Sequence, residues 1–149
     1  MVVWEISTAE EIDVPSEKIV EFYSQYSSST EDHIKWASDA ILATHRSRIY
    51  VAYHKREMLG LILVDAFSYL RSLVVAPEHR RNGIARALVA RAAEGRPFAR
   101  FEVYDPLALE LAMRLENWKM YSTILRCNSD GKRYILHEFR LKQPSVDSD

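Results

Sequence analysis

One segment of the chain indicates how it folds: Val75-Ala76-Pro77-Glu78-His79-Arg80-Arg81-Asn82-Gly83-Ile84-Ala85. Before it, residues 69–75 are predicted to form a buried strand, and Ala76-Pro77 ends that strand. After it, residues 83–94 repeat apolar side chains at helical spacing, and Gly95 is a helix stop signal. The stretch is therefore a polar loop that leads from a buried strand into a helix.

This loop has the chemistry of a phosphate-binding site. The first N–H groups of a helix have no partner within the helix, and the helix dipole adds partial positive charge there. Gly83 lets a phosphate approach the backbone, Ala85 keeps a nearby position small, and Arg80 and Arg81 add positive charge. A strand-to-helix turn that carries solvated arginines is the alternative that spacing alone leaves open. The P-loop pattern G-x-x-x-x-G-K-[ST] is missing, as is a G-x-G-x-x-G after the first strand.

Outward from the loop, hydrophobic periodicity predicts the order β-α-α-β-β-β-α-β-α-β-β. The order indicates an α/β (α+β) fold, with a mixed, mostly antiparallel sheet of about seven strands and helices on both faces. We expect a single domain over residues 1–149, in which 143–149 are a flexible tail. The expected strands are residues 2–7, 49–53, 58–64, 69–75, 98–104, 121–127 and 134–141.

Helix starts are marked by capping residues. Ser29 and Asp32 have capping-box spacing for the second helix. Asp105 before Pro106 is a typical N-cap for the last helix. The apolar positions of this last helix predict a core-facing side formed by Leu107, Leu111 and Leu115.

Composition narrows the class of protein. The chain has 149 residues, a net charge of −1 and one cysteine, Cys127, so an internal disulfide is excluded. The near-neutral net charge lacks the excess of positive charge that is typical of nucleic-acid-binding domains. No apolar run approaches the ~20 residues that a membrane helix needs, and residues 1–7 lack a signal-peptide pattern. We therefore expect a cytoplasmic protein that binds no membrane, and the run His79-Arg80-Arg81 leaves contact with RNA as the one nucleic-acid alternative.

Residues 73–88 resemble the acetyl-CoA signature of the GNAT superfamily of N-acetyltransferases. The signature [QR]-x-x-G-x-[GA] is met by Arg80, Gly83 and Ala85, after a strand that ends V-x-P. The predicted order of elements also matches the family over essentially the whole chain. The resemblance implies a GNAT-like fold, and acetyl-CoA as the acetyl donor.

The resemblance also implies roles for the loop and the strand before it. Backbone amides of residues 81–85 would hold the pyrophosphate, and the edge of residues 73–75 would pair with the pantetheine arm. The Val75 N–H would point at the thioester carbonyl. In this family the fourth and fifth strands splay apart to admit the cofactor. The implied cofactor-binding residues are Leu73, Val74, Val75, Arg80, Arg81, Asn82, Gly83, Ile84 and Ala85.

Amine acetylation needs a general base for the amine and an acid for the leaving thiolate. Phe101-Glu102-Val103 resembles the L-E-V segment of ribosomal-protein N-terminal acetyltransferases, whose glutamate is the base. A carboxylate on the polar face of a strand is the equal alternative for Glu102. The family's acid is a helix tyrosine, and Met113 falls at its position. Tyr104 and Tyr121 rank first as substitutes, although packing is the commoner role of a strand tyrosine.

The implied function is transfer of an acetyl group from acetyl-CoA to a primary amine in a ternary complex. The acceptor stays open between a protein N-terminus, a lysine and a small-molecule amine, and a homodimer is compatible with the sequence. The histidines show no metal-ligand spacing, so we expect no metal site. The alternative is a non-catalytic acyl-CoA-binding or protein-interaction module, because the helix tyrosine is missing.

Overall fold

The computed structural model describes residues 3–142, and the predicted tail at 143–149 lies outside the described residues. The chain divides into two compact units, unit 1 (Met1–Glu94) and unit 2 (Gly95–Asp149). The predicted order of strands and helices is confirmed, whereas the single domain over 1–149 stays a prediction. No helix within the described residues is long and apolar enough to span a membrane.

Unit 1 is built on a four-stranded antiparallel sheet in the order β1-β2-β3-β4. Residues of the central strands are buried on both faces, as shown by Val51 and Ala52 of β2 and by Leu61 and Ile62 of β3. Such double burial explains why residues 58–64 read as a continuous apolar run. The strands are β1 (Glu5–Thr8), β2 (Ile49–His54), β3 (Glu57–Val64) and β4 (Leu70–Val75).

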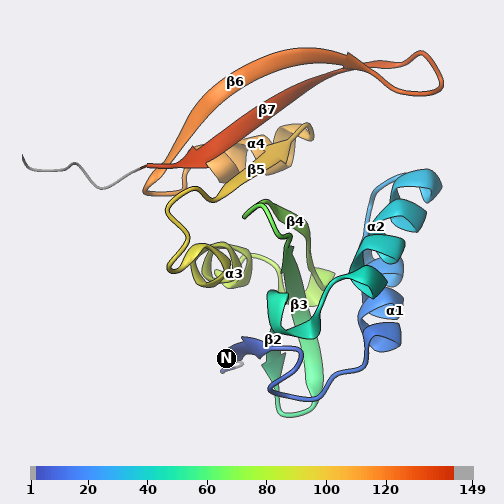
Figure 1. Cartoon of the computed structure of the whole chain (residues 1–149), viewed down its shortest axis with the longest axis vertical. Helices are drawn as coiled ribbons and strands as arrows, with labels where there is room; N and C mark the ends of the chain where they lie inside the picture. Colours follow the sequence, from blue (N-terminus) through green and yellow to red (C-terminus); the bar gives the residue numbers. More distant parts are fainter. Residues whose placement is uncertain (1–2, 143–149) are drawn as a thin grey trace, which may run out of the picture. The chain divides into compact units, whose positions relative to one another are not determined.

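Helices cover both faces of this sheet, as predicted (Figure 1). On one face, α1 (Ser16–Tyr26) and α2 (Glu31–Ala43) form a core with alternate residues of β2 and β3. On the other face lies α3 (Ile84–Ala93), where the Arg91 guanidinium stacks 5.1 Å above the Tyr50 ring. Short 3-10 helices, η1 (Arg46–Arg48) and η2 (Pro77–His79), precede β2 and follow β4.

Unit 2 has a three-stranded antiparallel sheet in the order β5-β7-β6. The Phe101 ring stacks on Phe139 at 5.2 Å and contacts Trp118 at 4.8 Å, which makes a small aromatic core. The β6–β7 hairpin extends well past the short β5 (Figure 1). Its elements are β5 (Arg100–Val103), α4 (Pro106–Met113), β6 (Trp118–Cys127) and β7 (Arg133–Leu141).

The predicted fold class is confirmed, with its seven strands divided between two sheets. Two local predictions are wrong. The N-cap of α2 is Thr30, whose side chain accepts the His33 N–H at 3.3 Å, rather than Ser29. In α4, Leu107 is 72% exposed and Leu111 is 46% exposed, and the residue that this helix buries is Ala112.

Candidate functional site

The predicted phosphate loop runs from the edge strand β4 through η2 into α3. The Ala76 N–H donates to the Leu59 carbonyl at 2.8 Å, which fixes the start of the loop to β3. The His79 N–H donates to the Ala76 carbonyl at 2.9 Å and closes η2. The Arg80 Nε then donates to the Val75 carbonyl at 3.1 Å. The loop therefore has a defined backbone path before the helix begins.

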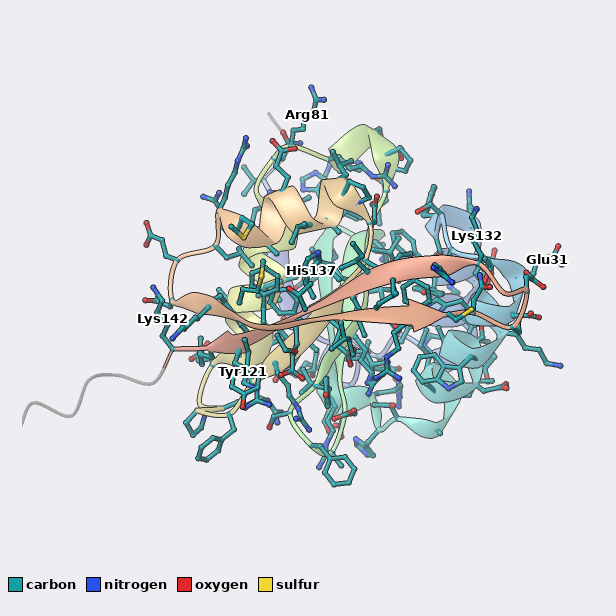
Figure 2. All side chains as sticks on the ribbon, turned by 90° about the horizontal axis from the view of Figure 1, so that it is seen from above. Glu31, Arg81, Tyr121, Lys132, His137 and Lys142 are labelled. Atoms are coloured by element: carbon teal, nitrogen blue, oxygen red, sulfur yellow. The ribbon has the colours of Figure 1, made fainter. Side chains whose placement is uncertain are left out.

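Gly83 makes the turn into α3. Its φ of +81° lies in the left-handed region that favours glycine, and a Cβ built there would meet no atom within 4 Å. No side chain of the described residues caps the first amides of α3, and Arg81, Asn82 and Gly83 are all exposed. Figure 2 shows the Arg81 side chain extending outward from the loop. Open space, uncapped amides and a nearby cation fit an anionic group such as a pyrophosphate.

The Val75 amide faces the free side of the β4 edge. Val75 is opposite Gly60, and the hydrogen bond beside this pair runs from Ala76 N–H to Leu59 O. In an antiparallel ladder this pattern marks a non-hydrogen-bonded pair, whose backbone groups point away from the neighbouring strand. Arg80 reaches the Val75 carbonyl from that side. The Val75 N–H is thus directed where an extended ligand would pair with the sheet edge.

Sequence reasoning missed the role of Gly60 in seating α3. A Cβ at Gly60 would lie 3.0 Å from the Val74 carbonyl oxygen, 3.2 Å from the Val75 side chain and 3.3 Å from the Ile84 side chain. Ile84 is the first residue of α3, so the missing side chain lets the start of that helix approach the sheet. A glycine inside an apolar strand pattern is the signal that would have revealed this close approach.

A β-bulge in β4 was also missed. Leu61 pairs with Val74 whereas Leu63 pairs with Arg71, so Ser72 and Leu73 together stand opposite one residue of β3. Ser72 has a φ of +57°, and its buried Oγ has no hydrogen-bond partner among residues 3–142. Bulges re-aim side chains and bend a strand, and Leu73 is left 38% exposed on the predicted cofactor edge. No residue in this stretch signals the bulge in the sequence.

The three predicted catalytic residues all belong to unit 2. Glu102 lies on β5, is exposed, and pairs with Glu138 of β7. Tyr104 follows β5 and is 51% exposed, with its ring 5.8 Å from that of Tyr134. Tyr121, marked in Figure 2, is 61% exposed on β6. Met113, where the family tyrosine was expected, is 62% exposed at the end of α4.

Strand register brings Glu102 into a polar row that includes a residue not predicted from the sequence. Glu138 pairs with Glu102 on one side and with Ser122 on the other. The Arg140 Nε donates to Glu138 Oε2 at 2.8 Å, and its guanidinium carbon lies 3.3 Å from the centre of the Tyr121 ring. Glu102, Glu138 and Arg140 therefore share one face of the sheet, because side chains two apart in a strand point the same way. Tyr121 lies where the register of β6 shifts, between Met120 and Ser122, and it joins this row through its contact with Arg140. The charged residues Glu138 and Arg140, two apart in a strand pattern, were the sequence signal that could have indicated this polar face.

Comparison with known families gives a match over the centre of the chain. Residues 45–121, just over half of the chain, match the family described as Acetyltransferase (GNAT) domain. The chain belongs to the GNAT acetyltransferase family. The match includes the whole loop from Val75 to α3 and continues through β5 to Tyr121. A comparison with curated proteins found no match.

Solved structures place this GNAT chain among proteins with the same fold at low sequence identity. The NatC complex bound to Gag peptide and CoA matches with a TM-score of 0.70 and 15% identity, over 97% of this chain and 100% of the other. Ard1 from Thermoplasma volcanium has a TM-score of 0.65 and 15% identity, over 95% and 100%. Apo YjaB from Escherichia coli has a TM-score of 0.65 and 19% identity, over 96% and 100%. Identities this low show the shared fold.

Proposed function

We propose that this GNAT chain is an N-acetyltransferase that moves an acetyl group from acetyl-CoA to a primary amine by direct transfer in a ternary complex. The observation that carries the proposal is the loop of unit 1. The left-handed Gly83 opens the uncapped α3, and the Val75 N–H faces the free edge of the adjoining strand. The pyrophosphate of acetyl-CoA would thus bind at the start of α3, and its extended pantetheine arm would bind along β4, the strand that precedes the loop.

Each part of the loop has a physical role in holding acetyl-CoA. Amides of residues 81–85 would bind the pyrophosphate at the positive end of the α3 dipole. Residues 73–75 would pair with the pantetheine arm as an added strand would. The Val75 N–H would donate to the thioester carbonyl and stabilise the negative charge that develops there. Arg80 holds the Val75 carbonyl, so it supports this arrangement as well as adding charge.

The thioester supplies an activated acyl carbon to the attacking amine. Glu102 is the proposed base: its carboxylate would take the proton that the amine nitrogen loses as the new C–N bond forms. Tyr121 or Tyr104 would donate a proton to the sulfur as the C–S bond breaks. Tyr121 is favoured by its place on the polar row with Glu102, whereas Tyr104 packs against Tyr134.

Two acceptor classes are supported by similar folds. NatC was solved with a Gag peptide, and an agmatine N-acetyltransferase matches with a TM-score of 0.67 and 10% identity, over 93% of this chain and 98% of the other. A peptide N-terminus and a small amine are therefore candidate acceptors, and a lysine side chain, which is also a primary amine, is the third. The second candidate function is an acyl-CoA-binding or protein-interaction module without turnover, favoured by Met113 at the position of the family's acid.

The experiment is calorimetric titration of acetyl-CoA into the wild type and into Gly83→Glu and Gly83→Gln. Both variants add bulk at the phosphate position, and glutamate adds a repelling charge, so we expect binding to weaken in the order wild type, Gln, Glu. Gly131→Glu is the matched control, because Gly131 in the β6–β7 turn also has a positive φ of +77° with open space around it. Absence of binding to the folded wild type would refute the cofactor role.

Turnover separates the two candidate functions. The wild type is incubated with acetyl-CoA and a panel of peptides and small amines, and release of free thiol is followed. Product formation above the uncatalysed rate supports the N-acetyltransferase. Tight acetyl-CoA binding without turnover of any amine supports the binding module instead.

A further inference from the structure

Beyond the proposed cofactor loop, unit 1 brings three potential metal ligands together. The Glu57 and Glu78 carboxylates and the His79 imidazole each offer one ligand atom, and these atoms all lie within 4.8 Å of one another. We propose that they form a site for one divalent ion of the Zn²⁺ type. This departs from our expectation of no metal site, which rested on the spacing of histidines along the sequence.

The sheet explains why residues so far apart in sequence meet here. Strands β3 and β4 are antiparallel, so the start of β3 lies beside the end of β4. Glu57 is the first residue of β3, and η2 with Glu78 and His79 follows β4 directly. The Ala76 N–H to Leu59 O bond of 2.8 Å ties the two segments together between these ligands. The backbone positions of all three ligands are therefore set by the sheet and by η2.

The cluster has no internal cation to balance its charge. Among residues 3–142, no hydrogen bond or ion pair engages the side chains of Glu57, Glu78 or His79. Four cations, Lys55, Arg56, Arg80 and Arg81, are close in sequence, yet none of them forms an ion pair with these carboxylates among the described residues. Two carboxylates at this separation repel each other, and a divalent cation would replace that repulsion with attraction to both.

The donor set indicates which ion it would select. One imidazole nitrogen with two carboxylate oxygens suits Zn²⁺, which binds three protein ligands and keeps a fourth position for water. Mg²⁺ prefers oxygen ligands in an octahedral shell and gains little from an imidazole. Bonds to Zn²⁺ of about 2.0–2.2 Å place neighbouring donors roughly 3.3 Å apart. Rotamer changes would be needed to bring the donors to that spacing, and Glu57 and Glu78 are both exposed and so have room for them.

A bound ion would stabilise η2, the turn at the start of the predicted phosphate loop. His79 is followed directly by Arg80, whose Nε holds the Val75 carbonyl. An ion shared by Glu57 and His79 would tie η2 to the start of β3, in addition to the backbone bond from Ala76. The expected physical effect is a higher melting temperature in the presence of Zn²⁺, because an ion that binds the folded chain more tightly than the unfolded chain stabilises the folded state.

The test is calorimetric titration of Zn²⁺, and separately of Mg²⁺, into the untagged chain carrying Cys127→Ser, which removes the exposed thiol as a competing ligand. Glu57→Gln and His79→Gln are made in this background. Loss of outer-shell partners alone weakens metal sites about 10–100-fold, so loss of a direct ligand should weaken Zn²⁺ binding at least about tenfold. His45→Gln is the matched control, because His45 Nδ1 lies 3.6 Å from a single carboxylate, that of Glu10.

We expect one Zn²⁺ per chain, weaker binding of Mg²⁺, and a rise in melting temperature that both ligand variants lose and His45→Gln keeps. Zn²⁺ binding that is unchanged in Glu57→Gln and His79→Gln would overturn the proposal, as would absence of Zn²⁺ binding to the parent. The substituted side chains are exposed or half-buried, so the variants should fold. The titration contains no acetyl-CoA, so its outcome does not depend on the proposed enzymatic function.

Discussion

Units 1 and 2 differ most in how much apolar surface their strands bury. In unit 1, Val51, Leu61 and Leu63 are at most 1% exposed, because helices cover both faces of the sheet. In unit 2, Leu125 is 65% exposed and Ile135 is 51% exposed, and they face each other across the β6–β7 hairpin. The same type of antiparallel pairing thus forms a closed core in one unit and a largely exposed surface in the other.

The difference suggests a division of roles. The loop from Val75 to Gly83 is attached to the closed core through Ala76, Arg80 and the close approach of Ile84 to Gly60. A site that grips a charged ligand benefits from such rigidity, since little order has to be gained on binding. The polar row is instead held on an exposed sheet, Glu102 and Glu138 by strand register and Tyr121 by its contact with Arg140. We therefore expect substitutions in unit 1 to affect binding and stability, and those in unit 2 to affect turnover.

The largest expected effect is that of Glu102→Gln on turnover. Glutamine keeps the size of the side chain and removes the proposed base, so kcat should fall about 10²–10⁴-fold. The Kd for acetyl-CoA should stay unchanged, because Glu102 is not part of the loop. Initial rates with the best amine acceptor, and calorimetry with acetyl-CoA, measure the two quantities. Glu116→Gln changes another exposed carboxylate of unit 2 and should leave kcat intact; a full rate in Glu102→Gln would rule out this residue as the base.

A matched pair of leucines tests the difference in burial. Leu61→Ala in β3 removes a side chain that is 0% exposed, and the resulting cavity should lower the free energy of unfolding by about 2–5 kcal/mol. Leu125→Ala in β6 removes one that is 65% exposed, and the change should stay within about 0.5 kcal/mol. Denaturant unfolding of both variants measures the values. A large loss in Leu125→Ala would show that this side chain is covered in solution.

The sequence predicted unit 1 well because its signals are local and strong. The continuous apolar run of β3 and the helical spacing of apolar residues in α3 each correspond to one element with a fixed periodicity. The Ser29 cap was wrong by one residue, because Thr30 offers the same hydroxyl chemistry one position later. The β4 bulge at Ser72 depends on pairing with β3, which no local pattern encodes.

In unit 2, the sequence predicted the strands and helices but not which side chains are buried or contact one another. The helical spacing of Leu107 and Leu111 indicated a buried face, yet both side chains are exposed. Periodicity shows which residues share a side of a helix. Whether another element packs over that side depends on tertiary structure, which the periodicity does not reveal. Glu138 was missed for the same reason, since its pairing with Glu102 and its bond to Arg140 arise from strand register. The roles proposed for Glu102, Tyr104 and Tyr121 stay predictions that rest on family resemblance and on this register.

An intermediate effect is expected for Gly60→Ala, which tests how the closed core positions the loop. The added Cβ would lie 3.0 Å from the Val74 carbonyl oxygen, and backbone atoms cannot yield as a flexible side chain does. Overpacking of this kind costs about 1–3 kcal/mol, and it should push the start of α3 away from the sheet. Both the free energy of unfolding and the affinity for acetyl-CoA should fall. An alanine variant with wild-type stability and affinity would show that α3 needs no close approach at this point.

The smallest expected effect concerns Asp65, which lies between β3 and β4. Partial burial acts to raise the pKa of its carboxyl, but hydrogen bonds from the Tyr69 and Phe67 amides and from Arg71 outweigh it and lower the pKa below the ordinary 3.8. A lowered folded-state pKa means that ionised Asp65 stabilises the protein above pH 3.8, and that this contribution is lost as the pH falls through the folded-state value. Asp65→Asn keeps an oxygen for the two amides and removes the charge.

We expect Asp65→Asn to be less stable than the wild type by about 0.5–1 kcal/mol at neutral pH, since the ion pair with Arg71 at 3.0 Å is partly solvated. The gap should narrow as the pH is lowered below the ordinary carboxyl value, because the wild type then loses the same charge. Urea unfolding of both proteins across this range measures the gap. Asp39→Asn, at an exposed position of α2, should show no such gap at either pH. A gap that persists in acid would mean that Asp65 acts through the geometry of its amide bonds rather than through its charge.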